Sequence, residues 1–565
     1  MSRGFQSSVE DVLHFGLGNS EEVEELKIRW PDRNVQTLQN VSANQMVTLY
    51  YNDASEEPSE PIENRTTLFE DITEKAGLNH RHSENEYVDF ERQPLLPHRL
   101  SKLGPGIAVG DVNGDGLEDF YIGGARGKSG TLYLQNENET FRASGSQPWD
   151  ADNQSEDMGA AFFDANGNGN LDLYVVSGGY EFEPGSEELQ DRLYLNDGEG
   201  NFEKTSGALP EMLTSGSVVI PGDYNGDGQI DLFVGGRVVP GNYPEAPGSF
   251  ILRNAQGQFS DVTSEIAPEL SEAGMVTDAI WTDYNNDRVQ DLIVVGEWMP
   301  IRIMANREGV FRNVTAESGL SESNGWWFSI AEAGLNKDGR MDYIAGNLGL
   351  NYRYKTSVEE PFQIFSNDFD EDGDNEIVLG YYNDGNLYPR AGKEALEREI
   401  PILEERAPTF HEFGLSTLPD LFGEQLLNES LHYQAKTFES SYLANNGDEG
   451  MKRIPLPNMA QVSAVKGIIT DDFDDDGIRD FLIAGNFHAT HSRTPRNDAG
   501  IGLYLKEESH GSLLPVPATE SGFYAAGDVK GLAVIELGRA GTTGILIPKN
   551  DDFLQLIKVN NLPED

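Results

Sequence analysis

The residues best suited to chemistry in this sequence are the carboxylate and amide side chains of seven short strings with a shared spacing. The pattern is D-x-[ND]-x-[ND]-G-x-x-[DE], complete in five copies and altered at one position in two. The copies read DVNGDGLED from Asp111, DANGNGNLD from Asp164, DYNGDGQID from Asp223, DYNNDRVQD from Asp283, GLNKDGRMD from Gly334, DFDEDGDNE from Asp368 and DFDDDGIRD from Asp472. Oxygen side chains packed this densely are typical of a site for a hard divalent cation.

The spacing favours calcium, which takes about six to eight oxygen ligands from a flexible cage. Side chains at positions 1, 3 and 5 converge on one point, the carbonyl at position 7 joins them, and a carboxylate at position 9 closes the cage. Glycine at position 6 permits the positive φ that turns the chain around the ion. An EF-hand closes instead with Glu at position 12 and is flanked by helices.

We therefore predict about six or seven Ca²⁺ ions. The predicted metal ligands are Asp111, Asn113, Asp115, Leu117, Asp119, Asp164, Asn166, Asn168, Asn170, Asp172, Asp223, Asn225, Asp227, Gln229, Asp231, Asp283, Asn285, Asp287, Val289, Asp291, Asn336, Asp338, Asp342, Asp368, Asp370, Asp372, Asp374, Glu376, Asp472, Asp474, Asp476, Ile478 and Asp480. The alternative is that the strings are ordinary turns, which Asp, Asn and Gly also favour.

Carboxylate count ranks the loops, because calcium affinity depends on ligand charge. The Asp368 and Asp472 loops offer four carboxylates each, so we expect them to bind most tightly. Arg288 stands where glycine belongs and should weaken the Asp283 loop, since a positive φ is costly for a bulky side chain. The Gly334 loop lacks the first carboxylate and should be the weakest.

The segments around these loops are short β-rich runs that end in glycine. The runs after the loops include DFYIGG, DLFVGG and DLIVVG, and hairpin segments such as LYLNDGEGNF and FILRNAQGQF follow further along the chain. A strand, a loop, a second strand and a hairpin make four strands per unit, which is typical of a propeller blade. We expect an all-β fold, a β-propeller over residues 65–565, with residues 53–64 as an acidic linker after a small N-terminal β domain.

The unequal spacing of the loops leaves the blade count open between seven and eight. Residues 67–72 provide one strand and the last residues provide three, and pairing them would close a ring. The stretch over about residues 387–435 contains two runs that are expected to be helical, KEALEREIPILEERA and LPDLFGEQLLNESL, within an insertion over about 383–460. The Asp368 loop would then turn between outer strands of a fifth blade of seven. If residues 383–460 form a blade of their own, the ring has eight.

The repeats resemble the FG-GAP or VCBS repeats of integrin-like propellers, over about residues 65–560. Residues 1–52, with HFGLG at 14–18 and the following VEELKIRWPDRNVQTLQNVSANQMVTLYY, resemble the ASPIC/UnbV domain that accompanies such propellers in cartilage acidic protein and its bacterial relatives. Residues 89–106 and 324–351 are also similar to the bacterial members. The resemblance implies no established chemistry. Because the ASPIC/UnbV-like part begins in mid-domain, we expect this chain to belong to a longer polypeptide with an upstream propeller.

An enzyme is the competing interpretation, with a site around residues 80–102. His80, His82, Glu84, Asp89, Arg92, His98 and Lys102 lie close together there and could serve a polysaccharide lyase. The alternative is that they hydrogen-bond a loop that crosses the propeller face. Likewise His488 and His491 resemble a metal pair, and Trp326 and Trp327 could stack on a sugar. Solvated histidines on a surface loop and tryptophans packed between blades are the favoured interpretations.

The composition limits the remaining function classes. With 41 Lys and Arg against 96 Asp and Glu, the formal charge is −55, which argues against nucleic acid and anionic membranes as partners. The absence of cysteine excludes disulfides, thiolate metal sites and a Cys nucleophile. No apolar run has the length of a transmembrane helix, and the N-terminus has no signal-peptide core. We expect an extracellular or cell-surface scaffold that is not catalytic and binds a protein or glycan ligand.

Overall fold

The computed structural model describes residues 12–18, 20–30, 34–55, 66–335, 338–491, 494–509 and 511–560. The chain divides into two compact units, Met1–Thr66 and Thr67–Asp565. In the first unit, β1 (Glu22–Arg29) and β2 (Val35–Ser42) pair antiparallel, with Glu22 opposite Ser42. Several apolar side chains of this unit are exposed, among them Phe15, Met46 and Tyr50. Residues 56–64 of the expected linker lie outside the described residues.

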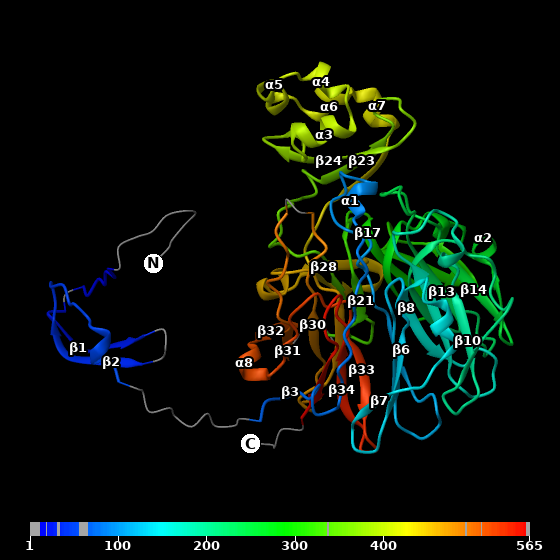
Figure 1. Ribbon diagram of the computed structural model, residues 1–565, viewed down its shortest axis with the longest axis horizontal. Coiled ribbons are helices and arrows are strands. Elements are labelled where there is room, and N and C mark those ends of the chain that lie inside the picture. The colour runs from blue at the N-terminus through cyan, green and yellow to red at the C-terminus, as the bar shows by residue number, and fades with distance from the viewer. Residues whose placement is uncertain are drawn as a thin grey trace. The chain divides into compact units, whose positions relative to one another are not determined.

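The second unit is dominated by antiparallel sheets whose strands follow one another along the chain (Figure 1). Three of them contain β4 (Ile107–Gly110), β5 (Asp119–Ile122), β6 (Thr131–Gln135) and β7 (Phe141–Ala143); β8 (Glu156–Phe163), β9 (Asp172–Gly178), β10 (Arg192–Asn196) and β11 (Phe202–Lys204); and β12 (Ser215–Gly222), β13 (Asp231–Val238), β14 (Phe250–Ala255) and β15 (Gln258–Asp261). Two more contain β16 (Met275–Thr282), β17 (Asp291–Met299), β18 (Arg302–Arg307) and β19 (Val310–Asn313), with β20 (Gly325–Trp326) paired to β17; and β29 (Gly467–Asp471), β30 (Asp480–Ala484), β31 (Leu503–Ser509) and β32 (Ser512–Val516).

One sheet joins the two ends of the second unit. It has the order β3-β35-β34-β33, formed by β3 (Phe69–Asp71), β35 (Gln555–Val559), β34 (Thr542–Ile547) and β33 (Ala533–Leu537). Phe69 lies opposite Val559. The expected pairing of an early strand with the last three is confirmed, and it covers the edge that β35 would otherwise expose.

Another sheet is interrupted by an excursion of the chain. It pairs β21 (Ser329–Glu332), β22 (Tyr343–Gly346), β27 (Ser441–Asn445) and β28 (Met451–Pro455). Between β22 and β27 the chain builds a separate sheet of order β25-β24-β23-β26, from β23 (Phe362–Asn367), β24 (Glu376–Asn383), β25 (Asn386–Pro389) and β26 (Leu431–Ala435). The expected helices are present within it as α3 (Lys393–Glu399), α4 (Leu403–Arg406), α5 (Phe410–Leu415), α6 (Leu418–Phe422) and α7 (Glu424–Glu429).

This excursion differs from the expected insertion over residues 383–460. The Asp368 loop joins β23 to β24 in the separate sheet, and not two outer strands of a fifth blade. Residues 441–455, placed inside the insertion, form β27 and β28 of the interrupted sheet. The sequence misleads here because β23, its acidic loop and β24 have the pattern of a blade, and only the distant pairing of β22 with β27 separates them.

The separate sheet and its helices form a layer at the top of the second unit, with α1 (Asp89–Arg92) beneath it (Figure 1). A large aromatic cluster joins this layer to the sheets below, and Trp298, Trp326, Tyr354 and Phe362 are among its members. The remaining short helices are α2 (Thr263–Ile266), α8 (Ala518–Ser521), η1 (Tyr51–Asp53), η2 (Pro148–Asp152), η3 (Glu187–Leu189), η4 (Pro268–Glu272), η5 (Gly447–Glu449) and η6 (Asn458–Gln461). In the described part of the chain, no helix has the length and apolar character needed to cross a membrane.

The core lies between consecutive sheets. Strand β9 is buried along its whole length because the sheets on either side cover both of its faces. The same packing brings the first and last sheets of the series together, since Phe120 and Ile122 share a cluster with Ile535 and Leu546. Each sheet of the second unit therefore has apolar neighbours on both faces, which holds the acidic loops at the ends of well-packed strands.

Candidate metal centre

The acidic loops occupy the same place in successive sheets. Those that begin at Asp111, Asp164, Asp223, Asp283, Asp368 and Asp472 each connect the first strand of a sheet, in chain order, to the second. The carboxylate at position 9 is in each case the first residue of that second strand, as Asp119, Asp172, Asp231, Asp291, Glu376 and Asp480. The repeated sequence pattern is thus also a repeated structural position.

The carboxylate at position 1 organises the backbone of its loop. Asp223 accepts hydrogen bonds at Oδ1 from the backbone N–H groups of Gly226 (2.8 Å) and Asp227 (3.1 Å), and at Oδ2 from that of Gly228 (2.9 Å). The Asp111 and Asp164 loops repeat all three hydrogen bonds. This carboxylate therefore shapes the loop from within.

Two positions of the loop have a positive φ. Position 6 has φ near 83° at Gly228, as the sequence pattern predicts, and Arg288 takes 68° at the same place. Position 4 also has a positive φ, which is 73° at Gly226. Residues with a side chain take the same conformation in two other loops, with φ 63° at Glu371 and 56° at Asp475. The pattern used to find the loops had no requirement at position 4, so this constraint was missed from the sequence.

The carboxylate at position 9 is removed from water. Asp231 has no exposed surface, accepts a hydrogen bond from the backbone N–H of Asn254 (2.8 Å), and leaves Oδ2 without a partner. Burial, together with the charges of Asp227 and Asp223, raises the pKa of Asp231 to about 7. Burial likewise raises the pKa of Asp119, Asp291 and Glu376 to about 7 and that of Asp172 and Asp480 to about 6. A bound cation would offset this accumulation of negative charge.

In four of the seven loops, an asparagine on the third strand fastens the loop to the one before it. The side-chain amide of Asn254 donates to the carbonyl of Ile230 in its own loop (3.0 Å) and to that of Ala165 in the preceding loop (2.8 Å). Asn196, Asn306 and Asn445 make the same pair of hydrogen bonds, and Gln135 donates to the carbonyls of Glu118 and Glu536. Sequence reasoning missed these residues, although an Asn recurs at the end of the third strand.

Two loops bring carboxylates close enough to share an ion. Oxygen atoms of Asp368, Asp370 and Glu376 lie within 4.8 Å of one another, and so do those of Asp472, Asp474 and Asp476. Asp370 Oδ1 and Asp474 Oδ1 are buried and have no hydrogen-bond partner. Orphaned buried oxygens in an all-oxygen donor set fit a hard cation such as calcium.

The Asp472 loop has a competing cation of its own. The Lys506 ammonium on β31 forms ion pairs with Asp474 and with Asp476, the latter at 3.1 Å. Carboxylate counting placed this loop among the tightest, but Lys506 lies outside the loop sequence and was not part of that count. The lysine neutralises part of the charge that would attract an ion.

The Gly334 loop is only partly described. Asn336 lies outside the described residues. Asp338 accepts a hydrogen bond from the backbone N–H of Arg340 (2.9 Å). Asp342 is buried and accepts hydrogen bonds from the backbone N–H of Asn445 (2.8 Å) and the hydroxyl of Tyr442 (2.7 Å). The carboxylate at position 9 thus keeps its role in holding the third strand where the first carboxylate is missing.

The segment considered for an enzyme site is packed across the ends of several sheets. Asp89 is buried and accepts hydrogen bonds from the backbone of Leu100 (2.6 Å) and Ser101 (2.9 Å). His98 is buried against Glu297 at 2.7 Å, and the Arg92 guanidinium donates to backbone carbonyls. These side chains hold a crossing segment in place. Burial lowers the pKa of His80 to about 4 and that of His82 to about 3.

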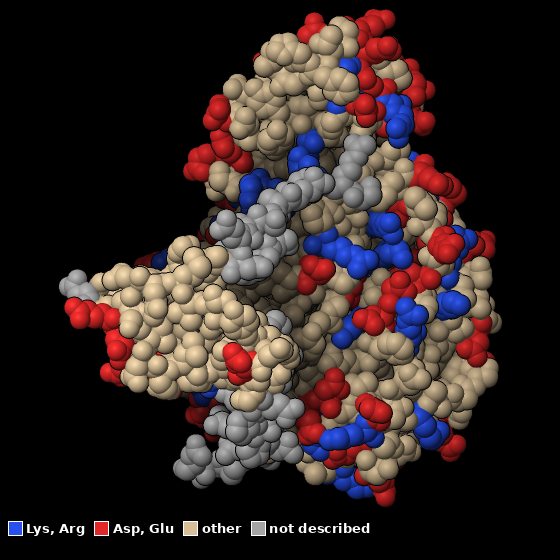
Figure 2. Space-filling model, turned by 60° about the vertical axis from the view of Figure 1, so that its left-hand side comes forward, with Lys and Arg blue, Asp and Glu red and all other residues tan. Residues whose placement is uncertain are grey.

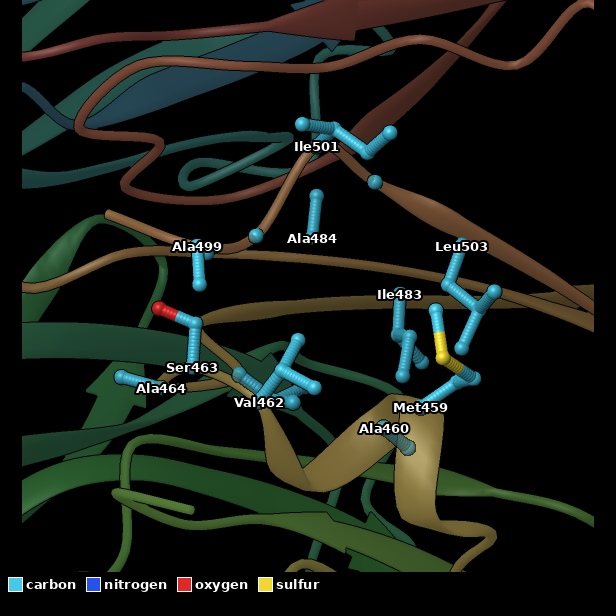
Figure 3. Close-up of a pocket in the computed structure, with 14 residues that line it drawn as sticks. Met459, Ala460, Val462, Ser463, Ala464, Ile483, Ala484, Ala499, Ile501 and Leu503 are labelled. Atoms are coloured by element: carbon cyan, nitrogen blue, oxygen red, sulfur yellow. The ribbon is translucent and has the colours of Figure 1, made fainter. Parts of the chain in front are cut away.

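The other side chains singled out from the sequence are mostly structural in their surroundings. Trp326 and Trp327 have no exposed surface, so neither can stack on a sugar. The ring of His491 lies against that of Phe90, with the ring centres 4.7 Å apart. A small pocket between η6 and strands β30 and β31 is lined by apolar residues such as Met459, and Ser463 supplies its only side-chain hydroxyl (Figure 3). That lining has no group able to act as a general acid or base.

Comparison with protein families agrees with this geometry. Residues 1–56 match the family model described as ASPIC and UnbV, and residues 111–175, 184–234 and 283–345 match the model described as FG-GAP-like repeat. The chain carries an ASPIC and UnbV domain and FG-GAP-like repeats. The matched repeats include the loops from Asp111 to Gly334. The Asp368 and Asp472 loops, which contain the two acidic clusters, lie beyond the matched FG-GAP-like ranges.

Two solved structures are similar to this chain at low identity. The V. cholerae biofilm matrix protein Bap1 shares 10% identity at a TM-score of 0.37, covering 86% of this chain and 91% of that one. The Dos1 propeller shares 9% identity at a TM-score of 0.36, covering 83% of this chain and 96% of that one. Scores this low carry no argument about function. No curated protein matches the sequence.

Proposed function

We propose that residues 67–565 form a seven-bladed β-propeller that binds calcium and serves as a non-catalytic interaction scaffold outside the cell or on its surface. The seven blades are the sheets that begin with β4, β8, β12, β16, β21, β29 and β33. The β23–β26 sheet is then an insertion between two strands of the fifth blade. Direct contact of β21 with β29, the first strands of the fifth and sixth blades, supports this count.

The observation that carries the calcium proposal is the recurrence of one acidic loop at one structural position. Its position-9 carboxylate is buried, and two copies gather carboxylate oxygens within 4.8 Å. In each loop the ligands would be the side chains at positions 1, 3, 5 and 9 with the carbonyl at position 7, as the sequence predicts. Calcium would offset the repulsion between carboxylates and fix the start of each second strand.

Crystals of the full chain grown with calcium test the ligand assignment. Anomalous scattering should place an ion in the Asp368 loop and in the complete loops at Asp111, Asp164 and Asp223. Asp368→Asn should remove the ion from its own loop and leave the others. Calcium-soaked crystals with no anomalous signal in any loop would contradict the proposal.

The scaffold proposal rests on how the surface is built. Acidic side chains are spread over the face in Figure 2, while Lys and Arg side chains gather below the helical layer. The segment over residues 80–102 is packed down by Arg92, Asp89 and His98, which leaves loops and edges as the binding surface. The net charge of −55 disfavours nucleic acid as a partner.

A binding screen identifies the partner class. Calcium-loaded full-length protein should retain a glycan or a protein ligand, and excess chelator should release it because the loops lose their shape. Polysaccharide cleavage by the wild-type protein that Asp89→Asn or His98→Gln abolishes would contradict a non-catalytic role.

A further inference from the structure

A second group of buried oxygen ligands lies away from the acidic loops. It consists of Glu84 and Asn85 from the crossing segment, Glu156 at the start of β8, and Glu181 just after β9, and we call it the Glu156 cluster. Glu84 and Glu181 lie near enough for their charges to act on Glu156, although the oxygens of the three carboxylates do not all lie within 4.8 Å of one another in this structure. The Asp164 loop follows the other end of β8. An extended strand rises about 3.3 Å per residue, so the two places are more than about 20 Å apart.

Glu156 is the central residue of this cluster. Its side chain is 1% exposed, and neither of its carboxylate oxygens has a hydrogen-bond partner. A Cβ at Gly179 would lie 2.2 Å from Glu156 Oε2, so the glycine leaves the space that the carboxylate fills. A buried carboxylate with both oxygens unpartnered is costly to fold unless another group satisfies it.

The surrounding side chains contribute further oxygens of the same kind. The Asn85 amide donates to Glu181 Oε2 (2.6 Å), which leaves Asn85 Oδ1 and Glu181 Oε1 buried and unpartnered. The Asn550 amide donates to Glu84 Oε1, which leaves Glu84 Oε2 in the same state. Five buried oxygen atoms from four residues therefore lack a donor.

In the described part of the chain, no lysine or arginine bonds to Glu156, although the charges of Lys102 and Lys530 act on Glu84. Arg126 reaches Glu181 Oε2 at 3.6 Å, on the oxygen that Asn85 already occupies. Lys530 donates to the carbonyl of Lys102 (2.7 Å) and pairs with Asp528 (3.0 Å). Burial raises the pKa of Glu156 well above its usual range, and the charges of Glu84 and Glu181 raise it further.

We propose that the Glu156 cluster binds a divalent cation of the calcium type, separate from the ions of the acidic loops. The donors are three carboxylates and one amide carbonyl, with no sulfur and no imidazole among them. Such a set suits calcium better than zinc or copper. The ion would join the crossing segment to the second blade, because two of its ligands come from each.

Counting bound calcium on the full chain tests this site. After dialysis against calcium, elemental analysis should give one ion fewer per chain for Glu156→Gln than for the wild type. Glu181→Gln should give the same loss and serves as the second variant if Glu156→Gln folds poorly. Glu86→Gln, at an exposed position of the same segment, is the matched control and should keep the wild-type count.

A further variant distinguishes calcium bound at the acidic loops from calcium bound at the Glu156 cluster. Asp472→Asn, combined with Glu156→Gln, should lose the ions of both sites if both bind calcium. A wild-type count for Glu156→Gln and Glu181→Gln would overturn the Glu156 site whatever the loops do. If calcium binds to none of the loops, one ion per chain that Glu156→Gln removes would still support the site.

Discussion

Residue identity at position 6 separates the Asp283 loop from its neighbours. Arg288 adopts φ 68°, a conformation that costs an ordinary side chain roughly 1 kcal/mol. Its backbone N–H donates to Asp283 Oδ2 (2.8 Å), and glycine would keep that hydrogen bond. We expect Arg288→Gly to raise the free energy of unfolding by about 1 kcal/mol in urea titrations.

The matched control runs in the opposite direction. Gly228 has φ 83° and open space where a Cβ would point, so Gly228→Ala should lose about 1 kcal/mol from backbone strain alone. Equal stabilities for Arg288→Gly and the wild type would show that the loop tolerates a side chain at position 6.

Lys506 sets the charge of the Asp472 loop. Its ammonium pairs with Asp474 and Asp476, and a cation entering the loop must displace or tolerate it. We expect Lys506→Met to tighten calcium binding at this loop by about tenfold, because the repulsion between the lysine and the ion is lost. Calorimetric calcium titration measures the change. Lys506→Arg keeps the charge and should bind as the wild type does, and an unchanged affinity for Lys506→Met would refute the competition.

The buried Lys466 predicts a rise of stability with pH. Burial lowers the pKa of Lys466 to about 7, below the ordinary lysine value of 10.5, although Asp528 lies 3.5 Å away. Between these values the unfolded chain binds one more proton than the folded chain, so folding becomes more favourable as pH rises. Lys530 and His488 also face this group.

The expected slope is up to about 1.4 kcal/mol per pH unit between pH 7.5 and 9.5, measured by urea unfolding. Lys466→Met should remove most of that slope, and Lys452→Met, at an exposed position, should leave it intact. A wild-type slope in Lys466→Met would place its origin elsewhere.

At single positions, the sequence predicted the backbone conformation that the loop spacing requires. It did not predict the burial and contacts of side chains that depend on neighbouring strands. Position 6 follows from the spacing, because a turn that tight needs a positive φ. The burial of Asp231 and the reach of Lys506 depend on neighbouring strands, which no string of nine residues contains. The positive φ of Glu371, at position 4, was not predicted. Three other loops have glycine at that position, but the shared pattern allowed any residue there and so did not indicate the constraint.

Among the elements, the strand-end asparagines connect one sheet to the next. Asn254 is buried, and its amide satisfies the carbonyls of Ala165 and Ile230. We expect Asn254→Leu to lower the free energy of unfolding by about 2 to 4 kcal/mol, since it leaves two carbonyls without a donor. Urea titration measures the loss. Gln258 is exposed on the adjacent β15, so Gln258→Ala is the control and should change the free energy of unfolding little. An equally small loss for Asn254→Leu would show that these hydrogen bonds do not stabilise the fold.

Strand and loop order could be predicted because each blade repeats it locally. The pairing of β3 with β35 also followed from the sequence, since three strands at one end lacked a fourth. The limits of the excursion did not follow, because β23 and β24 flank an acidic loop as the blade strands do. Only the pairing of Tyr343 with Leu443 shows where the chain rejoins its sheet.

For the whole molecule, the stability gained by binding calcium at all the proposed sites should exceed the effect of any single substitution. Every loop that binds an ion in the folded state and not in the unfolded state adds stability, about 2.7 kcal/mol at a hundredfold excess over the dissociation constant. The net charge of −55 adds to this dependence, because an ion-free chain retains the full repulsion.

Thermal unfolding of the full chain in excess chelator, compared with millimolar calcium at matched ionic strength, tests this directly. We predict a substantially lower melting temperature in chelator, restored by calcium and less well by magnesium, which needs a smaller octahedral shell. Melting curves that coincide in chelator and in calcium would contradict the account that these loops are calcium sites.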